Sequence, residues 1–304
     1  MMEKVLLDTD IGSDIDDCIC LAYLLTHPNC DLLGITTVSG EPEKRAMMAS
    51  VMCKVAGKGY IPIYPGADLP LLTPQMQPIA KQAEVLSKWD HETNFPKYEH
   101  IEFMRQTIRK YPNEVTLLAI GPMTNIALLF SLDPEIPSML KQLVVMCGVF
   151  SYKTPLYTCL TEWNARCDPY ATAIMYKAPV KNIKSVGLDV TTHVTMSKKE
   201  ILSKFTADIL KPVLDFSGVW FNDSGIITFH DPLAAAVIFD DNICKFERGN
   251  VEVELESNLS KGLTFWTPSS EGKNEVAFEV DSDRFFKQYF DIVGNKSNIM
   301  RGRE

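Results

Sequence analysis

Residues 5–17 have the sequence Val-Leu-Leu-Asp-Thr-Asp-Ile-Gly-Ser-Asp-Ile-Asp-Asp, an apolar run followed by five aspartates within ten residues. Val5–Asp8 predicts a buried strand, and Asp17–Leu25 predicts a helix whose first turn carries acids, where the helix dipole favours them. Carboxylates a few ångströms apart repel one another unless some are protonated or a hard ion neutralises them. Because ligands that are all oxygen suit calcium or magnesium, the stretch predicts a strand, a cation-binding loop and a helix.

Strands and helices alternate along the following residues. Leu32–Val38 is apolar and β-branched, and Glu41–Ala56 has helical periodicity. Further strands are predicted at Ile61–Tyr64, Val115–Ile120, Leu143–Cys147 and Ile183–Leu188, and helices at Ile101–Arg109, from Thr124 and after Pro169. This alternation predicts an α/β fold with a mainly parallel, Rossmann-like central sheet flanked by helices. Ligands bind beyond the carboxyl ends of such strands, which is where the acidic loop falls.

The pattern changes after Asp240. Alternating segments at Val251–Leu255, Gly262–Trp266 and Val276–Val280 predict added strands, and a final amphipathic helix is expected near Arg284–Phe290. The sequence has no internal repeat and no Pro/Gly/Ser linker, so we expect residues 1–304 to form a single catalytic domain. Leu72–Pro96 is proline-rich and then charged, which is typical of a lid over a site.

Composition excludes several classes of protein. No apolar run approaches the roughly 18 to 20 residues that span a bilayer, and no signal sequence is evident. A net charge of −9 without a basic run argues against a nucleic-acid partner and suits a small neutral or cationic ligand. The eight cysteines form no C-x-x-C pair and no cluster with histidine, which predicts buried free thiols in a cytoplasmic protein. His27, His100 and His193 lack acidic neighbours at ligand spacing and are expected to be ordinary surface or loop residues.

Polar residues also follow strands or begin helices in three later segments. They are Gly121-Pro-Met-Thr-Asn125, Glu162-Trp-Asn-Ala-Arg-Cys-Asp168 and His230-Asp231-Pro. Taken singly, each has an ordinary structural explanation, since Thr124 and Asp231 suit helix N-termini and Glu162 suits a solvated surface. Joined with the acidic loop, they predict one crevice lined by oxygen ligands.

These segments together resemble the calcium-dependent nucleoside hydrolases, the inosine-uridine preferring family. The resemblance runs in order through DTDIGSDIDD, GPMTNIALL, MCGVF, EWNARCDPYA, VGLDVT and HDPLAAA, nearly the whole chain. It implies a hydrolase that cleaves the N-glycosidic bond of a ribonucleoside or related N-riboside with a water activated by Ca²⁺. It also implies a homo-oligomer, either a dimer or a tetramer.

The resemblance assigns different roles to the opening aspartates. Asp10 matches a metal ligand that is also the general base, and Asp17 matches a second, bidentate metal carboxylate. Asp16 matches the carboxylate that accepts a hydrogen bond from ribose. The pair Asp16-Asp17 lies two residues farther from Asp10 than is usual in the family, so either Asp14 or Asp16 faces the sugar. Asp8 is expected either to support the loop or to be a ligand.

The later segments supply the remaining roles that the resemblance implies. Thr124 matches a residue whose backbone carbonyl binds the metal, and Asp231 matches a carboxylate that closes the coordination sphere and touches the ribose. Glu162 and Asn164 match residues that bind the ribose hydroxyls, and His230 matches a histidine at the leaving-base end. Trp163 lies between two of these residues and is either a core side chain or a surface on which a nucleobase stacks.

The chemistry is consistent with these residue types. Cleavage of an N-glycosidic bond passes through an oxocarbenium-like sugar, which nearby carboxylates stabilise. A water on Ca²⁺ is more acidic than bulk water, and Asp10 is placed to take its proton. His230 is the side chain expected to protonate the departing base, because imidazole titrates near neutral pH.

Two positions depart from the family. Leu156 stands where an asparagine usually contacts the ribose 5′-hydroxyl, and residues 81–92 replace a loop rich in glycine and histidine, with His91 as a possible substitute. Two other functions stay open, the first because of these departures and the second because a D-x-D pattern follows a strand. One is a ribose- or nucleoside-binding protein that is inactive or weak as a catalyst, and the other is a phosphatase with Asp8 as nucleophile and Asp10 as acid.

Overall fold

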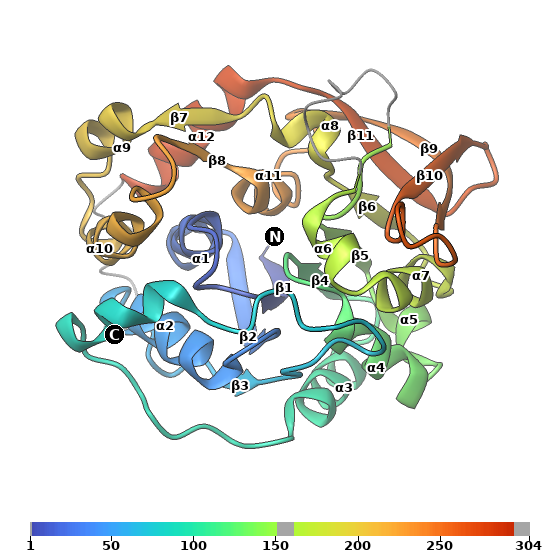
Figure 1. The fold of residues 1–304 in the computed structure, drawn as a ribbon, viewed down its shortest axis with the longest axis horizontal. Helices are drawn as coiled ribbons and strands as arrows, with labels where there is room; N and C mark the ends of the chain where they lie inside the picture. Colours follow the sequence, from blue (N-terminus) through green and yellow to red (C-terminus); the bar gives the residue numbers. More distant parts are fainter. Residues whose placement is uncertain (1, 151–160, 295–304) are drawn as a thin grey trace.

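A nine-stranded sheet forms the centre of the computed structural model, which describes residues 2–150 and 161–294 (Figure 1). The spatial order of its strands is β10-β9-β11-β6-β5-β4-β1-β2-β3. Their bounds are β1 Glu3–Thr9, β2 Cys30–Thr37, β3 Ile63–Pro65, β4 Val115–Ala119, β5 Gln142–Val145, β6 Ile183–Ser185, β9 Cys244–Val253, β10 Thr264–Pro268 and β11 Asn274–Val280. The strands from β11 to β3 pair in parallel, as predicted, and β9 and β10 are antiparallel additions at one edge.

Helices cover both faces of the sheet because its strands are apolar on both sides. In β1, Val5 and Leu7 join one core cluster, whereas Leu6 joins the other. One cluster includes side chains of α1 (Asp16–Thr26), α2 (Pro42–Val55), α10 (Lys211–Trp220), α11 (His230–Ala236) and α12 (Ser282–Val293). The other includes side chains of α3 (His100–Lys110), α4 (Thr124–Leu132), α5 (Ile136–Met139) and α7 (Pro169–Lys177). Strand β1 is thus buried from both sides, and the residues after it are held on a rigid support.

The shorter elements lie in the connections. They are η1 (Lys81–Lys88), α6 (Trp163–Cys167), α8 (Leu188–Thr191), β7 (Thr195–Ser197), α9 (Lys198–Lys204), η2 (Asp208–Leu210) and β8 (Ile226–Thr228). β7 and β8 form a separate two-stranded sheet. The predicted strand Ile183–Leu188 is shorter than expected, because Leu188 begins α8. The C-terminal strands join the central sheet, which agrees with their prediction as additions to the same fold.

Burial confirms the prediction for cysteine and corrects the one for histidine. The seven cysteines of the described residues are buried free thiols, and Cys159 lies outside them. His27 and His100 were expected on the surface or in loops, but both are buried. The ring of His27 stacks on Phe239 with centroids 3.7 Å apart, so packing outweighs the polarity of imidazole at this position. Within residues 2–150 and 161–294, no helix is long and apolar enough to cross a bilayer.

Candidate active site

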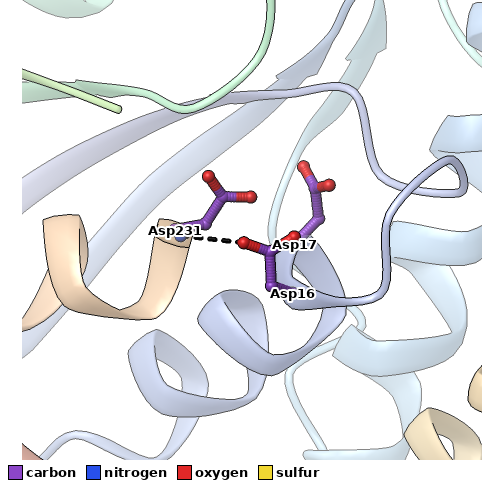
Figure 2. A group of neighbouring side chains, drawn as sticks. All are labelled: Asp16, Asp17 and Asp231. Atoms are coloured by element: carbon purple, nitrogen blue, oxygen red, sulfur yellow. Dashed lines mark hydrogen bonds between the residues drawn. The ribbon is translucent and has the colours of Figure 1, made fainter. Parts of the chain in front are cut away.

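Three buried carboxylates meet where two helices begin. Asp16 and Asp17 occupy the first turn of α1, and Asp231 occupies the first turn of α11 (Figure 2). One carboxylate oxygen from each lies within 4.8 Å of the others, although Asp231 is more than 200 residues away in the chain. The backbone N–H of Asp231 donates to Oδ2 of Asp16 at 3.0 Å, which fixes the two helix ends against each other. The arrangement is a cup of oxygen atoms at the carboxyl end of β1.

The electrostatics of this cup suit a hard cation. Burial, and then repulsion by neighbouring aspartates, raises the pKa of Asp16 and of Asp231 well above the usual range. The pKa of Asp17 is raised in the same way, with Asp10 as its principal neighbour, and Thr9 Oγ1 donates to its carboxylate. Carboxylates that are all buried and close together are costly unless they are protonated or bind a cation. The donor set therefore fits Ca²⁺ or Mg²⁺.

Asp10 lies beside this cup, just after β1. Its Oδ2 accepts from the side-chain amide of Gln77 at 2.5 Å, and its backbone carbonyl accepts from the guanidinium of Arg45. Burial raises the pKa of Asp10, while Arg45 and Gln77 oppose that rise. A side chain at Gly121 would place its Cβ 2.9 Å from Oδ1 of Asp10, so glycine there leaves that oxygen unobstructed.

Asp14 and Asp8 differ from the carboxylates of the cup. Asp14 is only half-buried, and its Oδ1 accepts from the N–H of Ile15 at 2.6 Å. Asp8 is fully buried, and its Oδ1 accepts from Thr36 and from Asn125 at 2.5 and 2.7 Å. Burial raises the pKa of Asp8 to about 7. Its Oδ2 is buried without a hydrogen-bond partner among the described residues, so both roles expected for Asp8, loop support and ligand, stay predictions.

The start of α4 is fixed by a residue that the sequence did not single out as functional. Thr124 is buried, and its hydroxyl donates to Oδ2 of Asp168 at 2.8 Å. The same oxygen accepts from the N–H of Leu71 at 2.8 Å, and Oδ1 of Asp168 accepts from the N–H of Ala171 at 3.0 Å. Asp168 thus joins α4, α7 and the loop after β3. Its position before Pro169 was the available signal, since Asp-Pro is a typical helix start.

Glu162 and Asn164 lie at the start of α6, Glu162 as its N-cap and Asn164 in its first turn. Glu162 is buried, not solvated, and accepts backbone N–H groups of Asn164, Ala165 and Gly148 at 2.6, 2.9 and 3.1 Å. Burial raises its pKa to about 7. The amide of Asn164 donates to the carbonyls of Ile120 and Met146 at 2.8 and 3.0 Å. Both amide protons of Asn164 are therefore used, and within residues 2–150 and 161–294 its oxygen is the group left for a ligand.

Trp163 is not a core residue, because 45% of it is exposed. Its indole Nε1 donates to the amide oxygen of Gln77 at 2.8 Å. Gln77 belongs to the proline-rich segment predicted as a lid. In the structure this segment lies against the acidic loop. The backbone N–H of Gln82 donates to the carbonyl of Gly12 at 3.2 Å, and its side-chain amide donates to the carbonyl of Ser13 at 3.1 Å.

His230 precedes Asp231 at the start of α11. Its Nδ1 lies 2.7 Å from the hydroxyl of Thr191. Burial lowers its pKa to about 4, so the ring is neutral at pH 7. A neutral imidazole carries one N–H donor, and the role of His230 at the leaving base stays a prediction.

The structure thus brings together four of the predicted residues and adds three that had no assigned role: Asp168, Gln77 and Arg45. Asp16, Asp17 and Asp231 form the cup, Asp10 lies next to it, and the remaining roles stay predictions. Gln77 and Arg45 were missed because neither lies in a recognisable motif. The one available signal was an arginine within the otherwise buried face of the predicted helix Glu41–Ala56. Leu156 lies outside the described residues, and His91 binds the carbonyl of Trp89 at 2.8 Å.

Comparison with known proteins identifies relatives over nearly the whole chain. The model of the family described as inosine-uridine preferring nucleoside hydrolase matches residues 5–287. The inosine-uridine preferring nucleoside hydrolase of Leishmania major is 29% identical, over 96% of this chain and 98% of that protein. Uridine nucleosidase 1 of Arabidopsis thaliana is 26% identical, over 88% of this chain and 85% of that protein.

Solved structures share the fold. A plant nucleoside hydrolase has a TM-score of 0.84 at 23% identity, over 96% of this chain and 99% of that one. A purine-preferring ribonucleoside hydrolase from Gardnerella vaginalis has a TM-score of 0.82 at 22% identity, over 98% and 99%. The acidic cup, the order of the segments and the family match agree. We conclude that this chain is a nucleoside hydrolase and belongs to the inosine-uridine preferring nucleoside hydrolase family.

Proposed function

We propose that the protein hydrolyses the N-glycosidic bond of ribonucleosides and releases ribose and a free base. The observation that carries this proposal is the cup of Asp16, Asp17 and Asp231, with Asp10 beside it at the carboxyl end of β1. Carboxylates gathered at one point suit a reaction in which positive charge develops on a sugar. The match of the family over residues 5–287 supports the same reaction.

Ca²⁺ is the cation that we propose for this site. Asp10, Asp17, Asp231 and the backbone carbonyl of Thr124 would hold it, a set of oxygen ligands that Ca²⁺ accepts. The ion, when bound, would make a neighbouring water easier to deprotonate and would fix the ribose diol. Asp16 lies in the same cup, and its Oδ2 is already occupied by the N–H of Asp231, which leaves Oδ1 for a sugar hydroxyl.

The side chains around the cup complete the proposed chemistry. Asp10 takes the proton of the attacking water, because its Oδ1 is unobstructed beside Gly121. Glu162 and Asn164 bind ribose hydroxyls, the latter through its amide oxygen. Asp14 is the alternative contact to the sugar. Trp163 presents an exposed indole on which the base stacks.

His230 acts at the leaving base in this proposal. Because burial keeps its pKa at about 4, it acts as a neutral ring that donates one hydrogen bond. If the hydroxyl of Thr191 donates to Nδ1, the proton of the ring is on Nε2, where it is available to a nitrogen or oxygen of the base. A base that is hard to expel without protonation would then depend on this histidine more than an easily expelled one.

The cellular setting is also part of the proposal. We propose a cytoplasmic location, supported by the seven buried free thiols of the described residues. We propose a homo-oligomer, either a dimer or a tetramer. Support comes from α4, where Leu128 and Leu132 are 36% and 65% exposed and offer an apolar face for a second copy. Light scattering of the purified protein tests this assembly.

A panel of substrates tests the function. Purified protein with Ca²⁺ is incubated with purine, pyrimidine and modified ribonucleosides, and free ribose and free base are measured separately. We expect both products in equal amounts from at least one nucleoside, without any need for phosphate. Binding of nucleosides without release of ribose would support the inactive binding protein. Release of phosphate from phosphate esters, dependent on Asp8, would support the phosphatase.

A further inference from the structure

We propose that Gln77 is a positioning residue, which aligns the carboxylate of Asp10 and the indole of Trp163 for the reaction. This inference rests on the proposed function and goes beyond it, because the resemblance to the family assigns no role to Gln77. Gln77 is 7% exposed and lies between the two residues. Its amide nitrogen donates to Oδ2 of Asp10 at 2.5 Å, and its amide oxygen accepts from Nε1 of Trp163 at 2.8 Å.

The chemistry of the partners fixes the orientation of this amide. An indole N–H only donates, so it requires the amide oxygen of Gln77. The amide nitrogen then faces Oδ2 of Asp10, and its other proton is used by Oγ of Ser39 at 2.9 Å. Turning the amide over would put an oxygen against a carboxylate and a nitrogen against an indole N–H. The amide therefore selects Oδ2 of Asp10 as an acceptor and leaves Oδ1 for the reaction.

The main chain of Gln77 is held by the same side chain that holds Asp10. Arg45 is fully buried and donates to the backbone carbonyls of Asp10 and Gln77, the latter at 3.4 Å. It also donates to the carbonyl of Gly40 at 2.8 Å. Since one rigid guanidinium binds both main chains, the distance between Asp10 and Gln77 is set by the buried core rather than by the loop alone.

Two separate effects follow from this arrangement. The hydrogen bond from Gln77 to Oδ2 keeps the Asp10 carboxylate in one rotamer, so loss of this bond lowers kcat. Loss of such a hydrogen-bond partner behind a metal ligand typically lowers activity about 10–100-fold. An acceptor for Trp163 keeps the exposed indole in one orientation, so its loss raises KM. A residue that only tied the segment to the acidic loop would produce neither pattern.

Three variants separate these effects. In Gln77→Ala both contacts are lost, and we expect kcat to fall about 10–100-fold and KM to rise. In Gln77→Glu an oxygen still accepts from Trp163, but at a pH where the new carboxyl is ionised no donor reaches Asp10, so at that pH kcat falls as far while KM stays near that of the wild type. Gln82→Ala is the matched control, because Gln82 lies in the same segment, is 1% exposed and, among the described residues, donates only to backbone carbonyls, at Gly12 and Ser13. We expect its kcat to stay within about twofold of the wild type, because its side chain ties the segment to the acidic loop without a bond to Asp10 or Trp163.

An NMR experiment tests the two contacts of Gln77 without measuring turnover. With ¹⁵N-labelled tryptophan, the indole resonance of Trp163 is assigned by its absence in Trp163→Phe. We expect this resonance to shift in Gln77→Ala and to stay in place in Gln77→Glu. With ¹⁵N-labelled glutamine, the side-chain resonance of Gln77, assigned from Gln77→Ala, is expected to shift in Asp10→Ala.

The outcomes distinguish the inference from the proposed function. If the wild type cleaves no nucleoside, the proposed function fails, and the resonances alone decide whether Gln77 holds both residues. The inference is overturned if Gln77→Ala keeps the kcat of the wild type, if Gln82→Ala loses as much, or if neither resonance responds. Should Gln77→Ala fail to fold, Gln77→Glu, which has the same shape as the wild type, decides the kinetic arm: a kcat that stays at the wild-type value up to the pH at which the new carboxyl is ionised overturns the inference.

Discussion

At the scale of single residues, five closely spaced aspartates differ in burial and in partners. Asp16 and Asp17 share the cup with Asp231, while Asp10 stands beside it with one oxygen bound by Gln77. Asp14 is half-buried and bonded to the next N–H along the chain. Asp8 lies beneath the loop and is bound by Thr36 and Asn125. Burial raises the pKa of all five, and their different partners decide what each carboxylate can reach.

Comparing Asp16→Asn with Asp14→Asn tests which aspartate faces the sugar. We expect Asp16→Asn to lower kcat/KM by about 100-fold, since it removes a charge from the cup. Asp14→Asn is the matched control and should cost less than about tenfold, because its carboxylate is half-buried and lies outside the cup. Steady-state release of ribose measures both values. The reverse order of effects would assign the sugar contact to Asp14.

The buried His27 predicts one part of the dependence of stability on pH. Burial lowers its pKa from 6.5 to about 4, so the unfolded chain binds a proton that the folded protein rejects between these values. The free energy of unfolding therefore loses this contribution as pH falls from about 6.5 towards 4. Urea unfolding at several pH values measures it, with His27→Asn as the comparison. We expect a flatter slope in the variant across this window; parallel curves would show that His27 does not titrate there.

At the scale of elements, the site depends on how α11 packs against α1 and α12. Phe229 immediately precedes His230 and is fully buried. Its ring lies 5.9 Å from that of Phe285, 5.2 Å from Phe286 and 5.8 Å from Tyr289, measured between centroids. This aromatic cluster fixes the start of α11 and therefore the position of the Asp231 carboxylate in the cup. A helix start on the surface would position a carboxylate less accurately.

Truncation of Phe229 tests this dependence. We expect Phe229→Ala to lower the free energy of unfolding by about 3–5 kcal/mol, because it removes a large buried ring and leaves a cavity. Phe265→Ala on β10 is the control, since that ring is 51% exposed, and it should cost under about 1 kcal/mol. Chemical denaturation measures both. Equal losses in the two variants would contradict the role of the cluster.

At the scale of the whole molecule, the order of strands and helices was predictable, whereas the contacts between distant loops were not. Strand β1 and helix α1 were predictable because their apolar periodicity and acidic helix start act locally. The meeting of Asp231 with Asp16 and Asp17 required the resemblance to a family, since no local rule joins residues so far apart in sequence. Gln77 was missed because its proline-rich segment has no periodicity, and the burial of His27 was missed because a lone histidine carries no packing signal.

Binding of Ca²⁺ should stabilise the whole fold. The cup holds carboxylates that repel one another, so an ion bound only by the folded protein raises the melting temperature. Above the dissociation constant, each tenfold rise in Ca²⁺ adds about 1.4 kcal/mol to the free energy of unfolding. Thermal denaturation with Ca²⁺ and with chelator measures this effect. Asp17→Asn should largely abolish it, whereas Asp241→Asn, at a carboxylate that is 74% exposed, should not. A melting temperature indifferent to Ca²⁺ would contradict the metal site.

The most direct test of the central claim is the release of ribose from inosine and uridine by the wild type and by Asp10→Asn, each with Ca²⁺. We predict that the wild type releases ribose from at least one of them. We predict that Asp10→Asn lowers kcat by about 10²–10⁴-fold, because the attacking water loses its general base. No release by the wild type, or the same kcat in Asp10→Asn, would contradict the account.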